Sequence, residues 1–177
     1  MGVVLIRIDD RLIHGQVVAG WVKAIKANHI MVVNDKVAQD QMQRVLLSMA
    51  VPSHLKLSIL NIEEAATALK QGIPEDDRVI ILLNSPLDAL SLVEKNVPLK
   101  SINVGGIHYC EGKKQILKAV CVDMEDIEAL YQLERREIEL EGRIVPTDER
   151  INIMDSVRKI TMGDNSVNLK EQPGEKG

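Results

Sequence analysis

The residues best suited to chemistry lie together near the start of the chain, in the run Asp9-Asp10-Arg11-Leu12-Ile13-His14-Gly15-Gln16. A neutral imidazole is a nucleophile near pH 7, and its phosphoryl adduct is a reactive, transferable group. The guanidinium of Arg11 offers a planar fork of donors that matches phosphate oxygens. The run therefore contains the groups needed to hold a phosphoryl group on His14.

The residues that follow His14 favour the same chemistry. Gly15 has no side chain to block the approach of a ligand. Gln16 stands in the first turn of an expected helix, where free N–H groups favour an anion. We therefore expect Gly15 and Gln16 to contribute to a phosphate-binding site.

The residues that precede His14 allow two interpretations. Asp9 or Asp10 could orient His14 by accepting its other ring proton, or could cap the following helix. Asp10 is the candidate we prefer. Two carboxylates oppose an incoming phosphate unless cations neutralise them, so Arg7 joins Arg11 as a candidate phosphate ligand.

A second cluster of polar residues occupies residues 103–115, which begin at the end of an expected strand. Gly105 and Gly106 let the backbone come close to a ligand. Lys113 could attract a phosphate or an acidic partner, and His108 could be a second proton shuttle. The alternative is a flexible, hairpin-like turn with solvated lysines.

The composition excludes several classes of function. The chain of 177 residues has a formal net charge of −4, and Trp21, Tyr109 and Tyr131 are its whole aromatic inventory. Neither a nucleic-acid surface nor a base-stacking groove fits that composition. No apolar run reaches the length of about 18 residues that a bilayer requires. The chain has two cysteines and no export signal, which predicts reduced thiols and a cytoplasmic location. No spacing of potential ligand residues supports a metal site, and no cofactor is expected.

Apolar, β-branched runs alternate with segments of helical period along most of the chain. Strands are expected at residues 3–8, 30–34, 55–60, 79–83, 102–104 and 119–122, and helices at 15–26, 36–49, 62–70, 87–93 and 124–140. This alternation predicts an α/β fold, with an open, mostly parallel sheet and helices on both of its faces. Residues 143–146 are expected to form a short edge strand, which could be antiparallel.

The expected fold also predicts where chemistry should be found. In such sheets, ligands bind at the carboxyl ends of the strands, in the loops that lead into helices. Those loops are residues 9–15, 34–36, 84–86 and 105–115, so Asn34 and Asp35 are further candidates. Residues 1–160 are expected to form one domain, and the polar residues 161–177 a flexible tail.

Residues 6–17 resemble the signature opening of the enzyme IIB component of one family, the mannose/fructose/sorbose family of the bacterial phosphoenolpyruvate-dependent sugar phosphotransferase system. Asn34-Asp35, Asn103-Val104-Gly105-Gly106 and Gly112-Lys113 match the same pattern. The resemblance implies a cytoplasmic phosphocarrier, associated peripherally with the membrane through its partners. It accepts a phosphoryl group from a histidine of a IIA protein or domain and passes it to a sugar held by the membrane subunits IIC and IID.

The resemblance also implies roles for individual residues. His14 is the phosphorylated residue, Arg11 stabilises the transferring group, and Asp10, Gly15 and Gln16 support them. Residues 108–116 resemble the N-acetylgalactosamine branch of the family. The phosphorylated ring nitrogen and a homo-oligomer are left open. So are two other functions, a phosphatase with a transient phosphohistidine and a non-catalytic anion- or nucleotide-binding module.

Overall fold

A computed structural model describes residues 2–167, with side chains described up to residue 163. It is built on a seven-stranded sheet with the order β3-β2-β4-β1-β5-β8-β9. The strands are β1 (Gly2–Asp9), β2 (His29–Val33), β3 (Lys56–Leu60), β4 (Arg78–Leu83), β5 (Ser101–Gly106), β8 (Glu139–Gly142) and β9 (Ile151–Asn152). Every neighbouring pair is parallel except β8 and β9, so the predicted α/β fold is confirmed.

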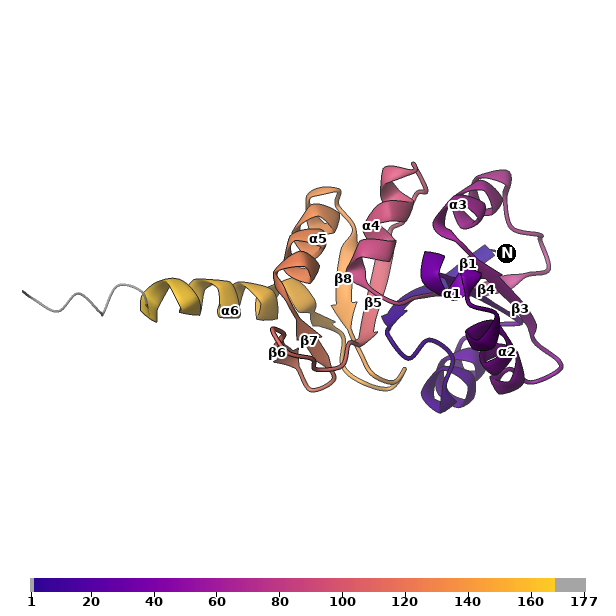
Figure 1. Cartoon of the computed structure of the whole chain (residues 1–177), viewed down its shortest axis with the longest axis horizontal. Coiled ribbons are helices and arrows are strands. Elements are labelled where there is room, and N and C mark those ends of the chain that lie inside the picture. Colours follow the sequence, from indigo (N-terminus) through magenta and orange to yellow (C-terminus); the bar gives the residue numbers. More distant parts are fainter. Residues whose placement is uncertain (1, 168–177) are drawn as a thin grey trace, which may run out of the picture.

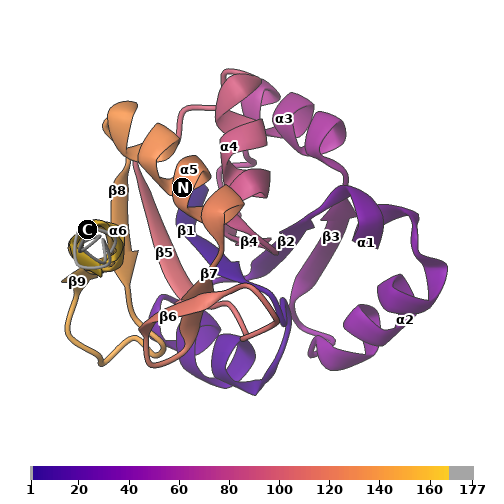
Figure 2. The same cartoon turned by 60° about the vertical axis from the view of Figure 1, so that its left-hand side comes forward.

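Helices cover both faces of this sheet (Figures 1 and 2). One face carries α3 (Ile62–Gln71), α4 (Pro86–Glu94) and α5 (Met124–Arg135), and the other carries the π-helix η1 (Gln16–Val22). Further helices are α1 (Asp35–Gln39), α2 (Gln41–Ala50) and α6 (Ile153–Val167). Among residues 2–167, no helix has both the length and the apolar character needed to cross a bilayer.

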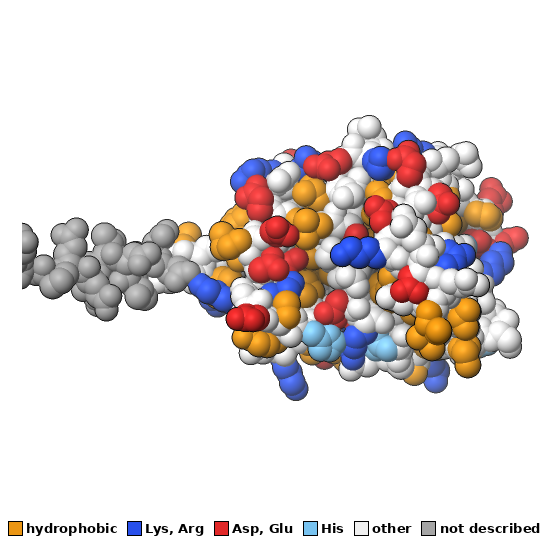
Figure 3. Space-filling model, viewed as in Figure 1, with side chains coloured by type: hydrophobic (Ala, Val, Ile, Leu, Met, Phe, Trp, Pro, Cys, Tyr) orange, Lys and Arg blue, Asp and Glu red, His pale blue; other side chains and the backbone are white. Residues whose placement is uncertain are grey.

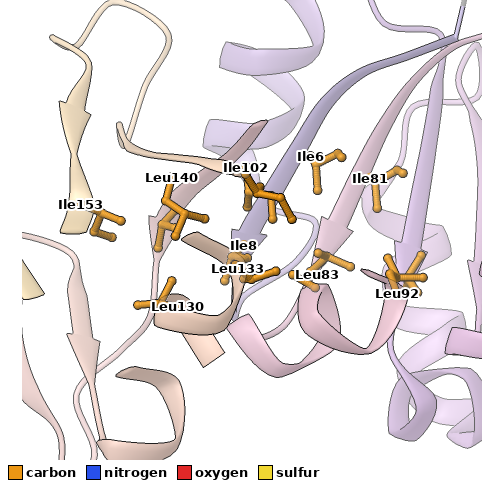
Figure 4. Close-up of a cluster of buried hydrophobic side chains, with 14 of the residues drawn as sticks. Ile6, Ile8, Ile81, Leu83, Leu92, Ile102, Leu130, Leu133, Leu140 and Ile153 are labelled. Carbon is orange, nitrogen blue, oxygen red and sulfur yellow. The ribbon is translucent and has the colours of Figure 1, made fainter. Parts of the chain in front are cut away.

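The core is divided into two clusters by the sheet. In β4, Ile81 and Leu83 face α3, α4 and α5, whereas Ile80 and Leu82 face the opposite side, and all four are fully buried. Figure 4 shows the first cluster between the strands and these helices. A central strand covered on both faces needs an unbroken apolar sequence, which explains the run at residues 79–83.

The strand expected at residues 119–122 corresponds to β7 (Val120–Val122), but it lies outside the main sheet. It pairs with β6 (Lys114–Leu117) in a small antiparallel sheet. This sheet is joined to the end of β5 by hydrogen bonds from Ile107 N to Ala119 O and from Cys121 N to Ile107 O, both 2.9 Å long.

The single helix expected at residues 36–49 is wrong, because Asp40 divides it. Asp40 has extended dihedrals, and its side chain accepts a hydrogen bond from Gln43 N, which starts a new helix. The resulting α2 has no buried residue. Four of its apolar side chains are 50–79% exposed, and Figure 3 shows hydrophobic side chains gathered where α2 lies. They are Met42, Val45, Leu46 and Met49.

The helix expected at residues 124–140 ends early, at Arg135. Glu137 adopts a left-handed conformation (φ 60°), and the chain then enters β8, which runs parallel to β5. The edge strand expected at residues 143–146 is therefore wrong: the strand lies at Glu139–Gly142, and the antiparallel edge is β9. The residues after β8 form a turn whose carbonyls, those of Arg143 and Ile144, accept hydrogen bonds from Arg7 of β1.

Helix α6 leaves the main body of the molecule and continues to Val167 (Figure 1). Its first turns are anchored in the core by Ile153, Met154 and Val157, all of which are buried. The helix thus includes residues 161–167 of the segment expected as a tail. Residues 168–177 lie outside the described residues, so the domain boundary at residue 160 stays a prediction.

Candidate functional site

The site lies at the carboxyl end of β1, between β4 and β5 in the centre of the sheet. The loop that follows β1 is held by Leu12 and Ile13, which are buried in the core cluster beneath η1. Leu12 takes a left-handed conformation (φ 56°), a strained geometry for a leucine. Because this apolar pair points inward, the flanking Arg11 and His14 are directed toward the surface.

Asp9 is the centre of the site, although it is completely buried. Its Oδ2 accepts a hydrogen bond from Arg7 Nη2 at 2.9 Å and lies 2.9 Å from His14 Nε2. Its Oδ1 accepts from the backbone N–H and the Nε of Arg11 at 3.2 and 3.3 Å. Burial alone would raise the pKa of Asp9, but the hydrogen bond of His14 and the charge of Arg7 lower that pKa to about 2. Asp9 is therefore an ionised acceptor at neutral pH.

His14 is fixed by this carboxylate in one orientation. An ionised carboxylate only accepts hydrogen bonds, so the contact places the ring proton on Nε2 and leaves the lone pair on Nδ1. The side chain of His14 is 16% exposed, which leaves the ring accessible from one side. A Cβ placed on Gly15 would meet nothing within 4 Å, so the backbone that follows His14 is open to solvent.

Arg11 and Gln16 complete the exposed part of the site. Arg11 Nη2 donates to Gln16 Oε1 at 2.9 Å, which ties the loop to the first residue of η1. The side chain of Arg11 is 38% exposed, so its guanidinium can still meet an anion from solvent. On the face seen in Figure 3, histidine side chains reach the surface next to a Lys or Arg side chain.

Arg7 does not fit the expectation that it binds phosphate, because no part of its side chain reaches solvent. Its Nη1 donates to Asn103 Oδ1 and to the carbonyl of Arg143, and its Nη2 donates to Asp9 and to the carbonyl of Ile144. A Cβ on Gly105 would come within 1.9 Å of the guanidinium. The geometry makes Arg7 a positioning residue that holds Asp9 charged and in place.

Asp10 also departs from the expectation, since it is Asp9 that contacts His14. Asp10 instead turns toward the loop after β5. Its Oδ2 accepts from the backbone N–H of His108 at 2.7 Å, and its Oδ1 lies 2.6 Å from His108 Nδ1. The side chain of His108 is 63% exposed, and the contact with Asp10 fixes the orientation of its ring.

Three other expected site residues serve the fold. The Oδ1 of Asn34 caps α1 by accepting from Val37 N, and the Oδ1 of Asp35 accepts from the first N–H of α3. Lys113 forms an ion pair with Asp126 at the start of α5 and is only 14% exposed. Their described hydrogen bonds and ion pairs involve none of the groups around His14. Gly106, in contrast, borders the site, because a Cβ there would lie 3.1 Å from Asp9 Oδ1.

The sequence patterns did not reveal that Trp21 contacts Arg7, the residue that holds Asp9 in place. Two guanidinium groups lie over the ring of Trp21, with Arg7 5.4 Å and Arg143 5.1 Å from its centre. Its Nε1 donates to the carbonyl of Ile144 at 3.1 Å. In the sequence, Trp21 is one of the regularly spaced apolar residues of a core helix. Only the fold shows that it also contacts the groups that support the site. In the part of the chain that the structure describes, no three His, Cys, Asp or Glu side chains are placed to hold a metal ion.

Comparison with known proteins identifies the family to which this chain belongs. Residues 3–168 match the family model described as "PTS system sorbose subfamily IIB component". The sorbose-specific EIIB component of Klebsiella pneumoniae is 37% identical over 159 residues, which cover 90% of this chain and 97% of that protein. The mannose-specific EIIAB component of Escherichia coli K12 is 40% identical over 156 residues, covering 88% of this chain and 48% of that longer protein. Other relatives are named for fructose and for N-acetylgalactosamine.

The fold is shared with solved structures as well. The IIBSor domain of the sorbose permease from Klebsiella pneumoniae superposes with a TM-score of 0.82 at 36% identity. The superposition covers 90% of this chain and 98% of that domain.

Proposed function

We propose that His14 carries the phosphoryl group of this protein, because the chain belongs to the sorbose subfamily of IIB components of the phosphotransferase system. Members of this family are sugar phosphotransferases, and so is this chain. The observation that supports this assignment is the 2.9 Å contact of His14 Nε2 with the buried, ionised Asp9. It leaves Nδ1 as the nucleophile and supplies a negative charge on the far side of the ring. We therefore also assign the phosphoryl group to Nδ1.

The transfer onto this protein is a displacement at phosphorus. The lone pair of His14 Nδ1 forms the new N–P bond, and the old N–P bond breaks with its electron pair returning to the donor imidazole. The His14 ring then carries positive charge, which Asp9 stabilises through Nε2–H. The transferring group resembles metaphosphate, and the guanidinium of Arg11 stabilises the charge on its oxygens.

The second transfer reverses the chemistry at His14. A sugar hydroxyl forms the O–P bond and releases its proton to solvent, while the electron pair of the N–P bond returns to Nδ1. The ring becomes neutral again, with its proton still on Nε2. The carboxylate of Asp9 thus serves both half-reactions without changing its own protonation, because its pKa of about 2 keeps it ionised throughout.

The partners that this chemistry requires are a IIA phosphohistidine as donor and membrane subunits IIC and IID that present the sugar. The protein is then a cytoplasmic carrier that meets the membrane only through those subunits. It must dock with the two partners in turn, so each interface should be small and short-lived. The name of the mannose relative, an EIIAB component, supports pairing with a IIA unit.

The acceptor is a hexose or a hexose derivative. The relatives are named for sorbose, fructose, mannose and N-acetylgalactosamine, and all lie at similar distances from this chain. The preference for N-acetylgalactosamine that residues 108–116 suggest stays a prediction. Uptake of each labelled sugar by a strain that carries only this transporter would decide it.

Labelling from radioactive phosphoenolpyruvate, through the general carriers and IIA, tests the assignment of His14. We expect an acid-labile, alkali-stable label on the wild-type protein and none on His14→Ala, while the exposed-histidine control His54→Ala is labelled normally. A label on His14→Ala would refute the proposal. A wild-type label that is lost rapidly without sugar or membrane subunits would favour a phosphatase instead.

A further inference from the structure

A cavity of about 600 Å³ opens beside the phosphoryl site. Arg11 and Gln16 line it on one side, so it is continuous with the groups around His14. The loop after β5 and the β6–β7 sheet form its other wall. Its volume lies within the range of about 300–1,000 Å³ that is usual for small-molecule sites.

The lining combines an aromatic ring with hydrogen-bonding groups. Tyr109, which is 70% exposed, lies in the wall next to His108. Gln115 lies in β6 and Lys118 in the turn between β6 and β7. The Nε2 of Gln115 donates to the carbonyl of Lys118, which orders this end of the cavity. An aromatic face beside amide and ammonium donors suits a hydroxylated ring, with its apolar face on the phenol and its hydroxyls on the donors.

The charge of the cavity favours an anion at the end near the site. Arg11 and Lys118 are its cationic residues, and Asp148 is its acidic residue. The Oδ2 of Asp148 already accepts hydrogen bonds from the backbone N–H groups of Ile144 and Val145, both at 2.9 Å. These hydrogen bonds partly neutralise the negative charge of Asp148 within its own turn. The guanidinium of Arg11 therefore makes the other end of the cavity favourable for an anion.

The direct transfer of a phosphoryl group requires space of this kind. The attacking oxygen must come within about 3–3.5 Å of the phosphorus, so the carbons next to that oxygen lie beside the phosphoryl-binding groups. We propose that the cavity is a subsite for a hexose phosphate, with the phosphate on Arg11 and the sugar ring between Tyr109 and Lys118. The subsite rests on the proposed function, and it makes this chain a contributor to acceptor recognition.

Binding of hexose phosphates to the unphosphorylated protein tests the subsite. The probes are mannose 6-phosphate and N-acetylgalactosamine 6-phosphate, compared with mannose and with inorganic phosphate. Titration followed by amide NMR should show millimolar binding of at least one hexose phosphate, with shifts at Arg11, Tyr109 and Lys118. Mannose and inorganic phosphate should each bind at least tenfold more weakly. Equal binding of inorganic phosphate, or shifts elsewhere only, would overturn the subsite.

Substitutions locate the binding within the cavity. Tyr109→Ala and Lys118→Ala should each weaken binding of the hexose phosphate at least fivefold, whereas the exposed control Lys23→Ala should not. Unchanged binding in both cavity variants would overturn the proposal. Labelling of wild-type His14 through IIA is measured in parallel. A protein that is labelled but does not bind refutes the subsite alone, and a protein that is not labelled refutes the proposed function.

Discussion

Replacing Asp9 by asparagine keeps the size of the side chain and removes the negative charge from the centre of the site. The amide can still accept a hydrogen bond from His14 Nε2, so the ring has no steric reason to move. What is lost is the charge that fixes the proton on Nε2 and stabilises the phosphorylated ring. The variant therefore isolates the electrostatic part of the account.

The size of both effects follows from the contacts of Asp9. A fall of its pKa from the ordinary 3.8 to about 2 corresponds to about 2 kcal/mol of stability. This stability is present above pH 4, where the unfolded chain is already ionised, and is lost as the pH falls toward 2. A hydrogen bond to a charged group is worth about 1.5–3 kcal/mol, which is about 10- to 150-fold in rate.

Two measurements check these magnitudes. Urea unfolding at pH 7 should show Asp9→Asn to be about 2 kcal/mol less stable than wild type, with the gap closing near pH 2. Rapid-quench labelling should show the transfer to His14 slowed about 10- to 150-fold. The control Asp155→Asn changes an exposed carboxylate and should alter neither. A transfer rate within twofold of wild type would refute the electrostatic role of Asp9.

Five further substitutions, at four positions, test other parts of the structure. The Arg11→Ala variant should fold normally, and its labelling should be at least about tenfold slower than that of wild type. Arg11→Lys should recover only part of the labelling rate, because an ammonium group lacks the planar fork of donors. Labelling of Arg11→Ala at the wild-type rate would exclude Arg11 from the mechanism. Gly105→Ala should lower the free energy of unfolding by about 1–3 kcal/mol in denaturant titrations, since its Cβ would overlap the buried guanidinium, whereas Gly15→Ala should change it by less than about 0.5 kcal/mol. Lys113→Met should lower the melting temperature by leaving Asp126 buried without its cation, and an unchanged melting temperature would contradict its structural role.

Much of the fold could be predicted because its signals are local. The central strands of the sheet are visible in the sequence as apolar runs, and the helix expected at residues 87–93 corresponds to α4, with Ser85 as its N-cap and Pro86 as its first residue. The stripe of apolar residues at 42–49 was misleading, because a helical period shows that one face is apolar and not that this face is buried. The edge strand after α5 was misplaced because Glu137 ends the helix with a left-handed turn that the sequence does not mark.

The site was predictable to the same extent. His14, Arg11 and Gln16 are close in sequence, so a single loop brings them together. The partners of Asp9 are not local: the carbonyls that hold Arg7 come from residues 143 and 144, more than 130 positions away. Whether Asp9 or Asp10 faces His14 depends on the pleat at the end of β1, since successive side chains of a strand point to opposite faces. Only the folded chain resolves that choice.

The nitrogen that carries phosphate tests the central claim most directly. Phosphorylated protein labelled with nitrogen-15 in its histidines can be examined by NMR, in which coupling to phosphorus identifies the bonded ring nitrogen. The structure predicts coupling at Nδ1 of His14, with Nε2 protonated and hydrogen-bonded to Asp9. Phosphorus on Nε2 of His14, or on any other residue, would contradict the arrangement from which the mechanism is derived.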